Sequence, residues 1–315
     1  MFNKLKDLLK KRNVIGFCNQ ENKVTVFVTK KLSMAKINKE IENPESPWEK
    51  EDVVPKKLRP SFLEREKETE VIEIGEVKAF IDSNTYRPVK GGMEIGPQGM
   101  NWSGTAGAVI KFKKYKDLPL LGQWNSLCEI LRYFGLKVED KFGLITNSHV
   151  VHWDVTKAQD PQIIVQPSRT KDVIGKSVYT EKMNKKGRNE YDVAIIELDD
   201  KISFLTEIIN IGNLKGFKDG VKGEKVQKYG RTTKLMEGEL LYKNVQINVN
   251  YGDWLLLSMV GLDMYSKISA PGDSGSLIVS KEDNKAVSLL FAGNNTTTFG
   301  IPICKIIDKL KIEII

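Results

Sequence analysis

The chain has 315 residues, of which 40% are hydrophobic and 29% are charged, and its formal net charge is +8. This composition is that of a soluble globular protein long enough for two or three folded units. No apolar run approaches the roughly 18 residues that span a membrane. The basic N-terminus, MFNKLKDLLKKRN, lacks the continuous apolar stretch of a secretory signal. We therefore expect a cytoplasmic protein without a membrane span.

The cysteines and histidines argue against two further kinds of site. The three cysteines, Cys18, Cys128 and Cys304, are widely spaced and form no CxxC pair. This pattern argues against a disulfide framework and favours a reducing compartment. The only histidines are His149 and His152, so a zinc site of the usual kind is not expected. We expect neither a metal nor a cofactor.

The positive charge is concentrated near the N-terminus. Residues 1–60 hold 14 Lys and Arg against eight Asp and Glu, a difference of +6. Such a segment can bind an acidic partner, either nucleic acid or a membrane surface, or it can be the solvated surface of a lysine-rich protein. We favour the solvated surface and expect no nucleic acid partner, because no RNA-binding signature or zinc finger accompanies the charge.

Residues 1–85 predict a small α+β module. Residues 13–33 resemble two strands joined by a polar turn. Residues 34–42, MAKINKEIE, can form one amphipathic helix, and residues 69–80, TEVIEIGEVKAF, alternate like a strand. Residues 86–98 are rich in glycine and proline and predict a linker.

Residues 99–315 predict an all-β domain. They contain many short apolar strands separated by turn residues, which is typical of a sandwich or a barrel. One segment differs, since apolar residues recur at helical spacing within residues 120–136, LLGQWNSLCEILRYFGL. We expect an amphipathic helix inserted between two strands, which packs on the core rather than serving as an exosite.

Residues 269–279, SAPGDSGSLIV, place two glycines around an Asp-Ser pair just before an apolar strand. Permissive backbone of this kind suits a tight turn, or a loop whose amides point at a ligand. Ser274 is therefore either a turn residue or a nucleophile. A serine hydroxyl becomes nucleophilic when a neighbouring base takes its proton, and histidine is the usual base.

Two residues can complete such a site. His149 follows an apolar strand in GLITNSHVV, which makes it a better candidate base than His152. In YDVAIIELDD, alternation places Asp192 on an apolar face, where a carboxylate needs a partner. Asp192 is thus the candidate that orients the imidazole. The order His149, Asp192, Ser274 is one of the orders known for such triads.

These motifs resemble those of trypsin-like serine peptidases. ITNSHVV resembles the histidine corner of that family, DVAII its aspartate strand and GDSGS its nucleophile loop. GTAGAVIK, KYGRTT, APGDSGSLIV and LLFAG, with VIEIGEVKAF and RPVKGGMEIG upstream, are similar to intracellular bacterial peptidases related to the plant narrow-leaf protein. The resemblance covers about residues 95–305 and favours Ser274 as the nucleophile.

The resemblance implies a fold and further site residues. The fold would be a double β-barrel of six strands each, preceded by the small α+β module. The amides of Gly272 and Ser274 would form an oxyanion hole that stabilises charge on the carbonyl oxygen. Ser276 departs from the family pattern, in which glycine usually follows GDSG. VKGG, at residues 89–92, resembles an activation sequence, but a linker turn is the preferred interpretation because cleavage after Arg87 would face a proline.

The resemblance also implies a substrate pocket. Ile268, six positions before the nucleophile, would form its floor, and Ala292, Gly293 and Phe299 its walls. An apolar floor predicts a small or apolar uncharged residue before the scissile bond, because burying an unpaired Lys or Arg charge is costly. Asp263, in the preceding segment, is the alternative source of a negative charge.

The sequence therefore predicts a serine endopeptidase that cuts a protein substrate, with a dedicated partner protein and a regulatory N-terminal module as further expectations. The resemblance implies regulated processing, including bacterial defence against phage. The alternative is an inactive or autoinhibited trypsin-like scaffold that binds a peptide or an acidic partner.

Overall fold

The structure is a computed structural model that describes residues 8, 11, 13–33, 53–58, 67–74, 85–115, 138–157, 161–252 and 255–315. The helices expected over residues 34–42 and 120–136 lie outside these ranges, as does most of the strand expected after Glu73. Among the described residues no helix is long and apolar enough to cross a membrane.

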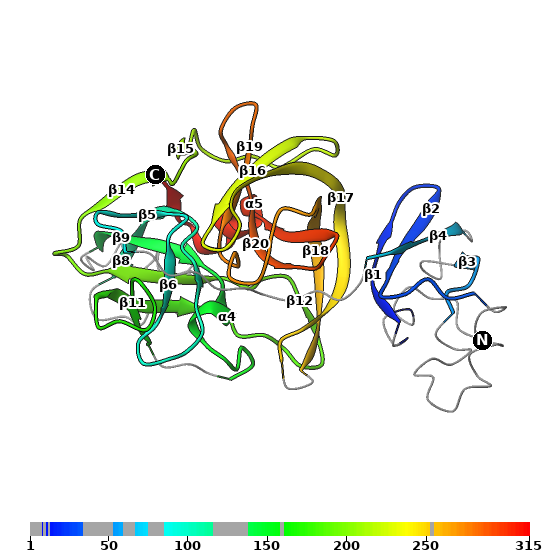
Figure 1. The fold of residues 1–315 in the computed structure, drawn as a ribbon, viewed down its shortest axis with the longest axis horizontal. Coiled ribbons are helices and arrows are strands. Elements are labelled where there is room, and N and C mark those ends of the chain that lie inside the picture. Colours follow the sequence, from blue (N-terminus) through cyan, green and yellow to red (C-terminus); the bar gives the residue numbers. More distant parts are fainter. Residues whose placement is uncertain are drawn as a thin grey trace.

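The described part of the chain is mostly β, as the sequence predicts (Figure 1). Its helices include α4 (Ser148–Val151) and α5 (Ile303–Leu310). The strands are β1 (Val14–Asn19), β2 (Lys23–Val28), β3 (Lys57–Leu58), β4 (Lys67–Glu73), β5 (Val89–Gly91), β6 (Glu94–Pro97), β7 (Gly104–Thr105), β8 (Val109–Tyr115), β9 (Val138–Thr146), β10 (Ile163–Val165), β11 (Val173–Thr180), β12 (Arg188–Asn189), β13 (Ala194–Leu198), β14 (Phe204–Ile208), β15 (Gly212–Asn213), β16 (Lys225–Gly230), β17 (Lys234–Asn250), β18 (Leu256–Ser266), β19 (Leu277–Ser280), β20 (Ala286–Gly293), β21 (Thr297–Pro302) and β22 (Glu313–Ile314).

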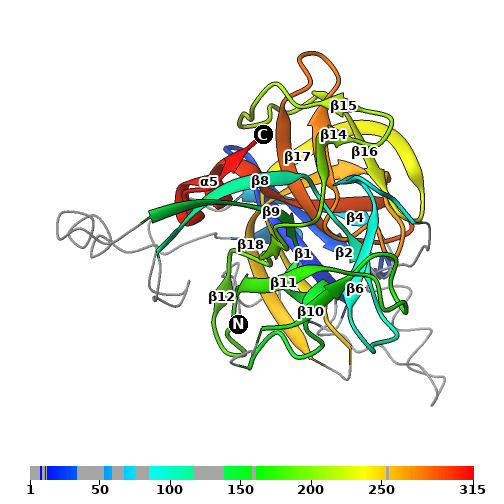
Figure 2. The same cartoon turned by 90° about the vertical axis from the view of Figure 1, so that its left-hand side faces the viewer.

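The strands form three sheets. An eight-stranded sheet has the order β22-β8-β9-β13-β11-β10-β6-β7, and a three-stranded sheet has the order β15-β14-β5. The third sheet, of 11 strands, carries most of the C-terminal half together with β1 to β4. Within it the pairings run β17–β18–β21–β20–β19–β16 and back to β17, so six strands close a circuit. Figure 2 shows β11, β10 and β6 lying below β16.

The central strands are buried because both of their faces are covered. Every residue of β13, AIIEL, and of β20, AVSLLFAG, is buried. Such continuous apolar runs differ from the alternating pattern of a strand with one solvated face. The exposed N-terminal strand β4, KETEVIE, does alternate between half-buried and exposed residues.

The N-terminal strands are joined to the rest of the chain. β1 pairs with β2 and also, antiparallel, with β17, where Gly16 faces Ile247 and Phe17 faces Gln246. β2 continues to β4 in parallel. Figure 1 shows these strands as an extension beyond β17, and they have a small apolar cluster of their own. The regulatory role expected of this module remains a prediction.

Residues 86–98, expected to be a linker, instead contain β5 and β6. Val89 and Ile95 in these strands and Met93 between them are fully buried, and the Val89 N–H donates to the Ser203 carbonyl at 3.0 Å. The glycines mark close packing, since a Cβ on Gly91 would lie 2.7 Å from the Gly107 carbonyl oxygen. Glycine and proline density therefore reflects short buried strands here.

Candidate active site

His149 and Asp192 meet because β9 and β13 are antiparallel neighbours. Thr146, at the end of β9, faces Ala194, at the start of β13. The chain therefore leaves β9 at the edge where it enters β13, and α4 carries His149 three residues later. Asn147 Nδ2 donates to the Asp192 carbonyl at 2.7 Å and ties the two segments together.

The Asp192 carboxylate is fully buried and accepts hydrogen bonds from His149. His149 Nδ1 lies 2.6 Å from Asp192 Oδ2, and the His149 backbone N–H donates to Oδ1 at 3.3 Å. The His149 side chain keeps 17% of its surface exposed. His152, three residues on, closes the end of α4, where its backbone N–H donates to the Ser148 carbonyl. The structure thus brings His149 rather than His152 to Asp192.

Tyr251 is a member of this cluster that the sequence reasoning missed. Its hydroxyl donates to Asp192 Oδ2 at 3.0 Å, and its ring meets the His149 ring edge-on with centroids 5.8 Å apart. Burial, and then the charge of Asp192, raises the pKa of Tyr251 well above its ordinary value. No local pattern marks this residue, which lies 59 positions after Asp192 in the chain.

Ser274 lies in the loop between β18 and β19. Its side chain is nearly buried, and its Oγ donates to the Phe291 carbonyl of β20 at 3.1 Å. Within the described residues, Ser274 makes no hydrogen bond to His149. The Ser274 carbonyl accepts from the Thr105 N–H of β7 at 2.7 Å, so the loop is held by the eight-stranded sheet as well as by its own.

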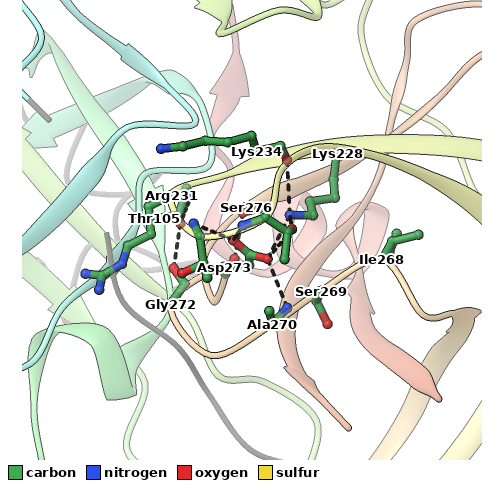
Figure 3. A network of polar contacts seen from close by, with 12 residues as sticks. Thr105, Lys228, Arg231, Lys234, Ile268, Ser269, Ala270, Gly272, Asp273 and Ser276 are labelled. Carbon is green, nitrogen blue, oxygen red and sulfur yellow. Dashed lines mark hydrogen bonds and ion pairs between the residues drawn. The ribbon is translucent and has the colours of Figure 1, made fainter. Parts of the chain in front are cut away.

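The Asp273 side chain anchors this loop (Figure 3). Its carboxylate accepts from Lys228 Nζ at 2.8 Å, from Thr233 Oγ1 at 2.6 Å and from the Ala270 N–H at 3.0 Å. Both Asp273 and Lys228 have fully buried side chains. Burial lowers the pKa of Lys228, and the neighbouring Asp273 opposes that shift. The intact chain therefore supplies the counter-charge for Asp273 internally.

Two threonine hydroxyls fix the orientation of the peptides around Gly272. Thr232 Oγ1 donates to the Pro271 carbonyl at 2.8 Å, and Thr105 Oγ1 donates to the Gly272 carbonyl at 2.7 Å. In a trans peptide the N–H points opposite to the carbonyl, so the Gly272 N–H points away from Thr232. Within the described part of the chain, the amides of Gly272 and Ser274 have no protein acceptor.

The residues expected to form the substrate pocket divide into two groups. Ile268 lies in an apolar cluster with residues such as Val226 and Leu290, and Figure 3 shows its side chain pointing away from the Asp273 network. The structure thus places the expected floor residue in the core. Ala292 and Phe299 face each other as register partners of β20 and β21, and Phe299 is fully buried.

Two hydroxyls instead lie beside Gly293. Ser269 Oγ lies 2.7 Å from Thr298 Oγ1, and a Cβ added to Gly293 would come within 2.5 Å of Ser269 Oγ. Ser269 thus lies beside Gly293, whereas the neighbouring Ile268 packs in the apolar cluster. Asp263, the alternative source of charge, is buried in β18 and accepts from Ser288 Oγ at 2.8 Å.

Among the described residues no group of three or more His, Cys, Asp and Glu side chains could hold a metal ion. The described cysteines, Cys18 and Cys304, are free thiols.

No family model matches the chain, and no curated protein matches it. The similar solved structures include a chymotrypsin of Cellulomonas bogoriensis, at 17% identity and a TM-score of 0.48, over 72% of this chain and 98% of that one. Protease A of Thermobifida fusca has 15% identity and a TM-score of 0.47, with coverage of 72% and 98%. A glutamic-acid-specific serine protease has 18% identity and a TM-score of 0.49, with coverage of 72% and 100%. At these identities and TM-scores, the proposal below rests on the chain's own geometry.

Proposed function

We propose that the protein is a serine endopeptidase of trypsin-like double-barrel fold, with His149, Asp192 and Ser274 as its triad. The observation that carries the proposal is the 2.6 Å contact between His149 Nδ1 and the fully buried Asp192 carboxylate. A buried carboxylate of this kind fixes the imidazole tautomer, so that Nε2 is the free basic nitrogen. The closed six-strand circuit of the C-terminal half supports the second barrel.

The proposed reaction uses these groups in two steps. Nε2 of His149 takes the Ser274 proton as Oγ attacks the scissile carbonyl, and it then gives that proton to the leaving amine. Water attacks the resulting acyl ester in the same way and releases the acid. The Gly272 and Ser274 amides are the proposed oxyanion hole, and each donor contributes about 3–4 kcal/mol to the transition state.

The Ser274 hydroxyl must rotate before it can react, because it donates to the Phe291 carbonyl in this structure. This hydrogen bond is the observation that supports a second candidate function, an inactive or autoinhibited scaffold that binds a peptide. We favour the peptidase, since rotation about one side-chain bond is enough to release the Ser274 hydroxyl from the Phe291 carbonyl.

A fluorophosphonate probe separates the two functions. An assembled triad labels at Ser274, and Ser274→Ala abolishes both labelling and hydrolysis while the fold persists. The expected loss of turnover is several orders of magnitude, about 10⁶-fold. Ser276→Ala, on the neighbouring serine, is the control and keeps labelling. Hydrolysis that survives in Ser274→Ala would refute the assignment.

The ion pair between Lys228 and Asp273 bears on whether the protein must be cleaved to become active. We propose that the protease needs no cleavage to release a new N-terminus, because Asp273 is already paired with a cation of the same chain. Val89, the first residue of the VKGG segment, is held in β5, paired with β14. Intact full-length protein is accordingly the form to be labelled.

The hydroxyls beside Gly293 define the proposed specificity. Ser269 and Thr298 fill the space in front of Gly293, so we propose that a small uncharged residue such as Ala, Ser or Gly precedes the scissile bond. Profiling with a peptide library tests this, and Thr298→Gly is expected to admit larger apolar residues. A preference for Arg or Lys would contradict the proposed pocket.

The substrate is proposed to be a protein inside the cell, since the described cysteines are free thiols. The similarity of the sequence motifs extends the proposal to regulated processing in a bacterial cell, with phage defence as its setting. Cleavage profiling of the cell's proteins with and without active Ser274 tests this step.

A further inference from the structure

Tyr251 is held in place by its own turn. It directly follows β17, its N–H donates to the Leu255 carbonyl at 2.9 Å, and the Leu255 N–H donates to the Gly252 carbonyl at 2.8 Å. Gly252 has a φ of +90°, which other residues rarely adopt, and Asn250 Oδ1 accepts its N–H at 2.9 Å. Hydrogen bonds on both sides of Gly252 therefore hold the backbone that presents the Tyr251 hydroxyl.

The hydroxyl reaches the same carboxylate oxygen as His149 does. Asp192 Oδ2 accepts from Tyr251 at 3.0 Å and contacts His149 Nδ1 at 2.6 Å. Since burial raises the pKa of Tyr251 well above its ordinary value, the phenol stays protonated and acts as a donor. Its partner is an anion without solvent access, and hydrogen bonds to buried charges are among the stronger ones.

We propose that Tyr251 is a positioning residue, whose hydroxyl holds the Asp192 carboxylate toward His149 and takes up part of its negative charge. The catalytic role in this inference rests on the proposed function, but the hydrogen bond between Tyr251 and Asp192 does not. From the part of the chain that the structure describes, the carboxylate has three donors, namely the His149 ring, the His149 backbone and Tyr251. Tyr251 follows β17 of the 11-stranded sheet, whereas Asp192 precedes β13 of the eight-stranded sheet, so this hydrogen bond joins the two sheets at the candidate site.

Loss of the Tyr251 hydroxyl should have a chemical effect that a loss of packing alone would not have. Without the Tyr251 hydroxyl, the negative charge of Asp192 is less neutralised, and the protonated form of the adjacent imidazole is stabilised. His149 would then hold its proton to higher pH, and less of the free base would be present near neutrality. A tyrosine that only filled space could be replaced by phenylalanine without this change.

The test uses Tyr251→Phe in the full chain and follows the histidine rings by NMR. The chain has two histidines, so two ring titrations are resolved, and His152→Gln assigns them. In Tyr251→Phe we expect the His149 midpoint to rise by roughly 0.5–1 pH unit, whereas that of His152 stays in place. Tyr179→Phe is the matched control, because it removes another tyrosine hydroxyl that donates to a carboxylate, that of Glu181. It should move neither midpoint.

The outcomes separate this inference from the proposed function. An unchanged His149 midpoint in Tyr251→Phe overturns the positioning role, whether or not the protein hydrolyses peptides. A raised midpoint in a chain that neither labels nor hydrolyses supports the contact and removes the peptidase proposal. In an active protein, the acid limb of the kcat/KM profile should move to higher pH with the NMR midpoint. On that acid limb the loss of kcat/KM is then about three- to tenfold.

Discussion

Burying the charged form of the Asp263 carboxyl costs free energy, and this cost should appear in the pH dependence of the protein's stability. It accepts from Ser288 Oγ at 2.8 Å, and it is fully buried in β18. Burial raises its pKa to about 6. The folded state thus binds this proton more tightly than the unfolded state, so the associated stability is present at acid pH and is lost as pH rises through about 6.

Replacing Asp263 by asparagine removes this titration. As pH rises from 4 to 7, the free energy of unfolding of the variant should gain about 2–3 kcal/mol relative to that of the wild type. Urea unfolding at several pH values measures the change. Asp200→Asn, at a side chain with 89% of its surface exposed, is the control and should run parallel to the wild type. A parallel course for Asp263→Asn would show that Asp263 stays ionised throughout.

At the scale of elements, the nucleophile loop depends on a strand that precedes it by more than 40 residues. Lys228 lies in β16, next to β19, and pairs with Asp273 just before β19 begins. Removing one partner of a buried ion pair typically costs about 3–5 kcal/mol, because the other charge remains buried. We expect Lys228→Met to lose about that much stability and to lose labelling by the fluorophosphonate.

Lys225→Met provides the matched control on the same strand. Lys225 has 71% of its side-chain surface exposed and pairs with Glu239 at the surface, so its loss should cost less than about 1 kcal/mol. Denaturant unfolding and labelling of both variants decide the point. Equal stability of the two variants would mean that Asp273 becomes protonated or gains another partner when Lys228 is absent.

The elements also show what could be predicted from the sequence. The apolar runs of β9 and β13 are visible in it, and so is the polar corner that carries His149. The contacts of Tyr251 with Asp192 and of Lys228 with Asp273 join residues 59 and 45 positions apart. No local pattern encodes such distances. Residues 86–98 contain β5 and β6 where their composition predicts a linker, because buried glycines that allow close packing resemble flexible ones in composition.

The described residues of the N-terminal module contact the rest of the molecule along β17 and beside Thr296. Its β1 pairs with β17, and the Ile74 carbonyl after β4 accepts from Thr296 Oγ1 at 2.8 Å, close to Gly293. A groove of about 620 Å³ lies between them, lined by residues that include Ile72, Tyr242 and Met264. The module thus borders the turn that leads to the proposed specificity pocket.

β5 and β6 determine the residue at which a truncated chain should begin. We expect residues 85–315 to fold and to keep fluorophosphonate labelling, because β5 and β6 stay with their partners. Peptide turnover should change, since Thr296 loses the Ile74 carbonyl and β17 loses its β1 neighbour.

Residues 95–315 would lack the buried side chains of Val89 and Met93, and burying such a side chain contributes about 1.5–3 kcal/mol. The shorter form should therefore unfold at clearly lower denaturant concentration. Failure of 85–315 to fold would make residues 1–84 part of the structural core, and unaltered turnover would remove the regulatory role.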